Sequence, residues 1–182
     1  MSTLKQQFIE KMIKDSLQLE QERLYYSAFD KLVRGLEAQF NQYEDASQGA
    51  KATMYFLKYI KNREVWDSIV DVYVDLCDAI DQFASGVLTD EEGAYLNRIV
   101  RNFRYSVEKV RTKQVARTLS DLARALSNLV LYIRNQRFHG HPKYSSLFSP
   151  PDVEFDADGR LFHFLSYLTP IMRVFLQKGL ED

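Results

Sequence analysis

The chain contains few residues that interrupt a helix. Its 182 residues include seven glycines and four prolines, and no proline occurs before residue 142. Because glycine and proline are the residues least compatible with a helix interior, the first 140 residues are predicted to be mostly helical. Apolar residues make up 46% of the chain, which is enough for the core of one compact domain.

Apolar residues recur at helical spacing along most of this region. The first predicted helix has a break near Asp15 or Ser16, because either residue can cap a second segment. Thr89 and Glu92 have the spacing of a capping box, which predicts the start of a later helix. The predicted helices cover residues 4–42, 50–63, 64–86, 90–110 and 119–138.

The sequence changes character after Gly140. Residues 141–152 are too rich in proline and small polar residues for a regular helix, and residues 153–164 alternate around a D-A-D-G turn as in a small β-hairpin. A closing helix follows, which Thr169 and Pro170 either start or kink. We therefore expect an all-α fold, an antiparallel helical bundle of five or six helices, with an irregular loop or small hairpin before the last helix.

The sequence shows neither an internal repeat nor a long linker, so one domain over residues 1–182 is expected. Cys77 is the only cysteine, which predicts no intrachain disulfide and no structural zinc site. Asp71, Asp75, Asp78 and Asp81 lie along one helix face and, without a nearby histidine, are interpreted as a solvated face. The charged N-terminus does not resemble a signal peptide, and no window reaches 18 apolar residues. A cytoplasmic protein with no membrane contact is expected.

The charge of the chain is unevenly distributed. The net charge is −1, but residues 98–143 contain eleven basic and two acidic residues and carry +9, which leaves −10 for the remainder. A local basic region on an acidic protein is typical of a site for a polyanion. The alternative is a solvated helix face that pairs with acidic helices elsewhere in the bundle.

Five consecutive apolar residues, 129–133, lie within the helix predicted over residues 119–138. A single core face explains three of them, and Leu131 and Tyr132 lie off that face. Because a helix that is apolar on all sides is buried on all sides, the run indicates either a central helix or a subunit interface. The remaining histidine outside the 132–142 stretch, His163, lies among apolar residues and is interpreted as a core or interface residue.

The same helix ends in the stretch YIRNQRFHGHP, residues 132–142. One interpretation is a helix C-terminus, where cations suit the dipole and Gly140 and Pro142 stop the helix. The other is a site that handles phosphate. His139 can take or deliver a proton near neutral pH, Arg134 offers a planar fork of donors for phosphate oxygens, and Asn135 can orient the imidazole or bind a phosphate oxygen.

An arginine and a histidine beside RNA are sufficient for one reaction. The ribose 2′-OH attacks its own 3′-phosphate, a base takes the proton, and a cation stabilises the charge on the non-bridging oxygens. This reaction requires no metal and no cofactor, and neither is expected here. One histidine per chain performs half of the acid–base work, which favours a homodimer that brings two copies together.

The stretch Arg134-Asn135-Gln136-Arg137-Phe138-His139 resembles the Arg-x4–6-His motif of the HEPN superfamily, and Gly140 gives the common local form "RNQRFHG". This resemblance implies a HEPN-like core over about residues 63–180, with N-terminal helices over residues 3–61 extending the bundle. It also implies a homodimeric, metal-independent endoribonuclease, the toxin or effector of a toxin–antitoxin or abortive-infection system in antiviral defence, with a cognate antitoxin or regulatory protein as partner. The catalytic residues would be Arg134, Asn135 and His139.

Further candidates for RNA contacts flank this motif. His141 also satisfies the spacing from Arg134, so either histidine can be the acting one, and Arg137 is either an RNA contact or a cation at the helix end. The other candidate RNA-binding residues are Lys143, Tyr144, Arg101 and Arg104. Two alternative functions remain: a non-catalytic HEPN-like dimeric module that binds RNA, a nucleotide or a protein, and an unrelated helical adaptor.

Overall fold

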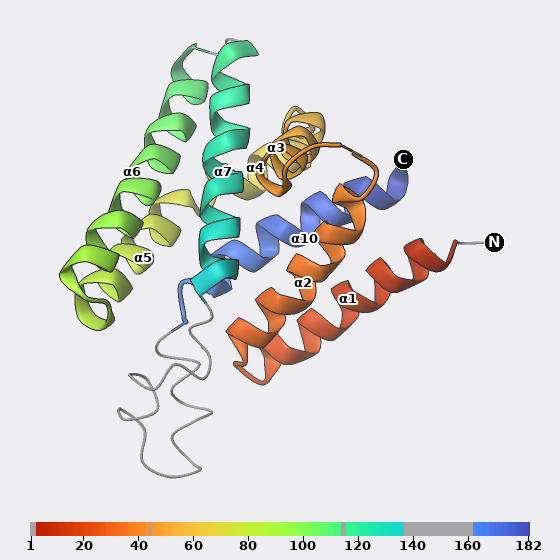
Figure 1. The fold of residues 1–182 in the computed structure, drawn as a ribbon, viewed down its shortest axis with the longest axis horizontal. Coiled ribbons are helices and arrows are strands. Elements are labelled where there is room, and N and C mark those ends of the chain that lie inside the picture. Colours follow the sequence, from red (N-terminus) through yellow and green to blue (C-terminus); the bar gives the residue numbers. More distant parts are fainter. Residues whose placement is uncertain (1–2, 44, 114–115, 137–161) are drawn as a thin grey trace.

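The structure is a computed structural model that describes residues 3–43, 45–113, 116–136 and 162–182. These residues form helices and no strand, which confirms the all-α class (Figure 1). They form eight helices, so the predicted number of five or six is not confirmed. Most of the predicted loop or hairpin before the last helix, residues 141–161, lies outside the described residues, and residues 162–164 form a turn. The helices are α1 (Leu4–Gln21), α2 (Tyr25–Phe40), α3 (Gln48–Tyr59), α4 (Arg63–Val70), α5 (Tyr73–Val87), α6 (Asp90–Lys113), α7 (Ala116–Gln136) and α10 (Leu165–Glu181).

The break in the first predicted helix lies at residues 22–24, so the position predicted near Asp15 or Ser16 is wrong. Ser16 is fully buried inside α1, where its hydroxyl donates a hydrogen bond to the Ile13 carbonyl at 2.7 Å. The hydroxyl shares the Ile13 carbonyl with the helix backbone, so the buried side chain has a hydrogen-bond partner without ending the helix. The chain turns at Arg23, whose φ of 62° is left-handed, and α2 then runs back alongside α1 (Figure 1).

The predicted helix over residues 64–86 is two helices, α4 and α5, which meet at Val72. The φ of −127° and ψ of −6° at Val72 are not helical, and the bend places both Ile69 and Leu76 in the core. The predicted capping box of α6 is confirmed. The Glu92 amide donates to the Thr89 hydroxyl at 3.3 Å, and the Thr89 amide donates to the Glu92 carboxylate at 3.2 Å.

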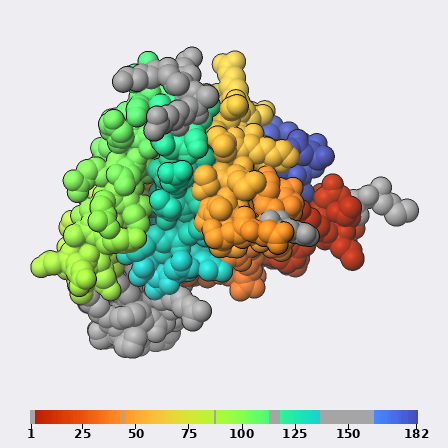
Figure 2. Space-filling model, turned by 45° about the horizontal axis from the view of Figure 1, so that its top comes forward, coloured from red at the N-terminus to blue at the C-terminus, as the bar shows by residue number. Residues whose placement is uncertain are grey.

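Helix α7 lies between α6 and α3 and also contacts α2 (Figures 1 and 2). Leu129, Val130 and Ile133 are buried, whereas Leu131 and Tyr132 are half-buried. The Tyr132 ring packs against α6, with its centroid 5.1 Å from that of Tyr95. A central position within one chain therefore explains the apolar run at residues 129–133, and a subunit interface stays a prediction.

Helix α10 contacts five other helices, α1 to α5. Pro170 lies inside this helix, so the alternative that it starts the helix is wrong, and the Ser166 carbonyl lacks the hydrogen bond that Pro170 cannot donate. Beyond Pro170, the Arg173 guanidinium pairs with the Glu20 carboxylate of α1 at 2.7 Å, with side chains only 11% and 16% exposed. The N-terminal helices thus share one continuous core with the rest of the described chain.

None of the described helices combines the length and the apolar character that crossing a membrane requires.

Candidate functional site

Arg134 and Asn135 lie in the last turn of α7, which ends at Gln136. The Arg134 Nη1 donates a hydrogen bond to the Asn135 side-chain oxygen at 2.9 Å. The Arg134 Nη2 lies 2.6 Å from a carboxylate oxygen of Glu37 on α2. The guanidinium is therefore held from two sides. Its side chain is still 43% exposed, so other donors of the same group can reach a ligand.

These side chains line an open cleft of about 740 Å³ between α2 and the end of α7. The volume is within the range of roughly 300–1,000 Å³ that is usual for sites of small ligands. Helix α2 contributes Glu37 together with Tyr26, Asp30 and Arg34. Asp30 and Arg34 form an ion pair at 3.0 Å, so each arginine of the cleft has a carboxylate partner.

The rest of the predicted motif lies outside the described residues. This applies to the proposed acid–base residue His139, to its alternative His141, and to Arg137, Lys143 and Tyr144. The structure therefore describes two of the three predicted catalytic residues. That Arg134 and His139 belong to one catalytic site stays a prediction.

Arg101 and Arg104 do not line the cleft of Arg134. Both are on α6 and line a smaller pocket of about 250 Å³ together with Asp81 of α5. Arg104 pairs with Asp78 of α5 at 2.5 Å, whereas Arg101 is exposed. The structure therefore places these two candidate RNA contacts on the α5 side of α6, and Arg134 on the α2 side of α7.

The basic segment shows features of both predicted interpretations. Arg104 and Arg134 each pair with an acid of another helix, as the interpretation of a solvated face paired with acidic helices predicts. Arg101 and Arg124 are exposed. Arg111 bonds a neutral group, the Tyr73 hydroxyl, at 3.0 Å. The charge of the segment is therefore partly balanced by acids of neighbouring helices and partly open to solvent.

Two acidic residues of α2, Asp30 and Glu37, pair with the arginines of the cleft and were not identified from the sequence. Asp30, Arg34 and Glu37 recur at helical spacing, and this polar stripe is the signal that marks one open face of α2. Of the two interpretations of His163, the core residue is wrong because its side chain is exposed, and the interface residue stays a prediction. The His163 ring lies between two tyrosines, with ring centroids 6.1 Å from Tyr25 and 5.5 Å from Tyr167.

Cys77 is buried on α5, and burial raises the pKa of its thiol to about 12. A thiol with this pKa remains protonated at neutral pH and is a poor nucleophile. Among the described residues, no three histidine, cysteine, aspartate or glutamate side chains are grouped closely enough to hold a metal ion.

Comparison of the chain with protein-family models, with curated proteins and with solved structures finds no match. The function of the cleft is therefore inferred from its own residues.

Proposed function

We propose that the chain is a metal-independent endoribonuclease of HEPN type, in which Arg134 binds the scissile phosphate and His139 transfers protons. The observation that carries this proposal is the position of Arg134. It lies in the last turn of α7, on the wall of an open cleft, and is fixed by Asn135 and Glu37. An arginine oriented in advance stabilises developing charge without the cost of reorganisation during the reaction.

In the proposed reaction the 2′-oxygen of a ribose attacks the adjacent phosphorus, and its proton passes to His139. The bond from phosphorus to the 5′-oxygen breaks, and that oxygen takes up a proton. The products are a 2′,3′-cyclic phosphate and a 5′-hydroxyl end. Arg134 stabilises the negative charge on the non-bridging oxygens. A homodimer supplies a second histidine, so that one copy removes a proton while the other delivers one.

The test compares the protein with three variants on single-stranded RNA or tRNA in the presence of EDTA. Arg134→Ala and His139→Ala are expected to lower the cleavage rate by on the order of 10²-fold or more. Arg124→Ala removes an exposed arginine of the same helix and is expected to cleave at the unchanged rate. The proposal is wrong if the protein does not cleave RNA, or if cleavage survives both substitutions.

The ion pair between Arg134 and Glu37 favours a second candidate, the non-catalytic HEPN-like dimeric module that binds RNA, a nucleotide or a protein. An arginine whose charge is already compensated contributes less to a developing negative charge than an unpaired one. Expression separates the two candidates. A toxin of a toxin–antitoxin or abortive-infection system arrests growth, and His139→Ala relieves the arrest, whereas both forms of a binding module are harmless.

A further inference from the structure

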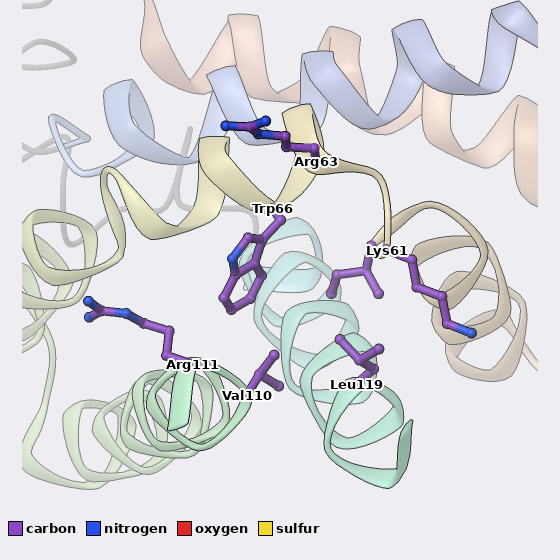
Figure 3. A pocket seen from close by; sticks show the side chains of 7 residues that line it. Lys61, Arg63, Trp66, Val110, Arg111 and Leu119 are labelled. Carbon is purple, nitrogen blue, oxygen red and sulfur yellow. The ribbon is translucent and has the colours of Figure 1, made fainter. Parts of the chain in front are cut away.

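A second pocket lies at the opposite end of α7 from Arg134. It is formed where the junction of α3 and α4 meets the C-terminal end of α6 and the first turn of α7, and it has a volume of about 550 Å³ (Figure 3). Trp66, the only tryptophan of the chain, lies in the middle of this pocket.

The floor of the pocket is apolar. Ile60 and Val110 are buried, and Leu119 and Trp66 are half-buried. Figure 3 shows the indole of Trp66 directed from α4 toward α6, with Val110 and Leu119 on the far side of the pocket. An indole held in this way offers a flat surface, which favours a ligand with a flat aromatic ring.

Among the described residues that line the pocket, the charged ones are cations: Lys61, Arg63 and Arg111. Lys61 and Arg111 lie on opposite sides of Trp66, Arg63 lies above it on α4, and the three charged ends point apart (Figure 3). The Arg134 cleft differs, because the carboxylates of Asp30 and Glu37 are among its lining residues. The cationic lining of the Trp66 pocket favours a ligand that carries negative charge in addition to its aromatic ring.

The partners of these cations leave most of their charge available. Arg111 donates one hydrogen bond to the uncharged Tyr73 hydroxyl at 3.0 Å. Arg63 pairs with Asp67 at 3.6 Å, but the side chains are 93% and 55% exposed, and such pairs contribute little. Lys61 has no ion-pair or hydrogen-bond partner within the described parts of the chain.

We propose that this pocket binds a nucleotide, whose base stacks on Trp66 over the apolar floor and whose phosphate contacts Lys61 at the rim, while Arg63 and Arg111 add to the positive potential of the pocket. Stacking on an aromatic side chain combined with a cationic rim is the usual physical basis for holding an unpaired nucleotide. The same chemistry serves a free mononucleotide and one nucleotide unit of a single-stranded RNA. The proposal does not rest on the nuclease activity, because it concerns binding at a different part of the molecule.

The emission of Trp66 reports on this pocket directly, because the chain has no other tryptophan. We would titrate full-length His139→Ala protein, which removes the proposed cleavage, and excite at the red edge where adenine does not absorb. The ligands are AMP, adenosine, ribose phosphate, inorganic phosphate and a short oligoadenylate. A saturable change is expected with AMP, and adenosine and ribose phosphate are each expected to bind at least about tenfold more weakly.

A double substitution, Lys61→Ala with Arg63→Ala, tests the cationic rim without disturbing the core, because both side chains are exposed. It is expected to weaken AMP binding by about tenfold, as loss of a charge-assisted contact and of nearby positive charge does. Arg124→Ala removes a charge from an exposed site on α7 outside the pocket and is the matched control, with unchanged affinity.

Two outcomes support the proposal and identify the source of the ligand. An oligoadenylate that binds much more tightly than AMP indicates that the pocket holds part of an RNA strand. Equal affinities for the oligoadenylate and AMP indicate a free nucleotide. Three outcomes overturn it: no saturable change in emission with any nucleotide, adenosine binding as tightly as AMP, or equal affinities of the double variant and Arg124→Ala. Loss of RNA cleavage by the unsubstituted protein bears only on the Arg134 site.

Discussion

Arg134 on α7 and Glu37 on α2 form an ion pair of 2.6 Å that joins the two walls of the cleft. The Glu37 oxygen in this pair is shielded from solvent, and its contact with Arg134 is an ion pair that lacks hydrogen-bond geometry. A phosphate that approaches Arg134 therefore competes with a carboxylate that already neutralises the guanidinium.

Glu37→Gln is expected to tighten RNA binding about two- to fivefold, which corresponds to a partly exposed ion pair that the RNA no longer has to displace. The salt dependence of binding should become steeper, because one more cation is free to contact phosphate. Fluorescence polarisation with labelled single-stranded RNA, in a His139→Ala background, measures both quantities.

Asp30→Asn is the matched control for this change. It also removes one carboxylate from the cleft and frees one arginine, but that arginine is Arg34. If the two substitutions change RNA affinity equally, the total charge of the cleft determines binding, and Arg134 contributes no more than Arg34.

Gly179→Ala is expected to destabilise the fold by about 1–3 kcal/mol, the usual effect of overpacking. A methyl group at this position of α10 would overlap the Tyr55 hydroxyl and come within 3.0 Å of the Gln39 side-chain amide. The Tyr55 hydroxyl has little freedom to move, since it is buried and donates a hydrogen bond to the Phe175 carbonyl at 2.8 Å. Urea denaturation measures the difference.

Gly86→Ala is the matched control, because a methyl group there meets no other atom within 4 Å. It is expected to leave stability unchanged or to raise it by about 0.5 kcal/mol through helix propensity. Similar losses in the two variants would contradict the steric explanation.

Asp81→Asn is expected to stabilise the protein near neutral pH. Burial raises the pKa of the Asp81 carboxyl, and the neighbouring Asp78 adds to the shift, while Arg104 and Arg101 oppose it. A raised folded-state pKa means that folding disfavours the ionised form. The resulting penalty is fully present above the raised pKa and disappears as the pH falls below the ordinary value of 3.8.

The gain from Asp81→Asn should therefore shrink as the pH is lowered, when urea denaturation is followed over a series of acidic buffers. Asp75→Asn removes a carboxylate from an exposed position in the first turn of α5, where a negative charge suits the helix dipole, and no gain is expected. A gain at Asp81 that does not vary with pH would contradict this explanation.

Cys77 is expected to resist alkylation by iodoacetamide in the folded protein at mildly alkaline pH. The thiol is buried, and its pKa of about 12 leaves almost no thiolate. Mass spectrometry should show one added group per chain after denaturation in guanidinium and none before. Rapid labelling of the native protein would show that α5 opens readily or that the thiol is accessible.

Local chemistry allowed part of this fold to be predicted from the sequence. The Thr89–Glu92 capping box marks the start of α6 because its two hydrogen bonds form within one turn. The bend at Val72 was not predictable, since continuous apolar spacing across it is compatible with one helix, and tertiary packing of Ile69 and Leu76 decides the matter. The turn at Arg23 lacked a signal because its left-handed residue is not glycine.

The contacts of the candidate site were likewise only partly predictable from the sequence. Arg134 and Asn135 are neighbours in sequence, so their pairing follows from the local motif. Glu37 approaches Arg134 only because α2 packs beside α7, and a single sequence does not show which helices become neighbours. The separation of Arg101 and Arg104 from the Arg134 cleft was missed for the same reason, since the charge of a segment carries no information on which neighbouring helix each side chain faces.

The central place of α10 has a consequence for how the protein is made. This helix contacts each of the first five helices, and a ribosome synthesises it after every other described helix. Until it emerges, the parts of the first five helices that pack on α10 have no partner, and this apolar surface is open to aggregation during synthesis.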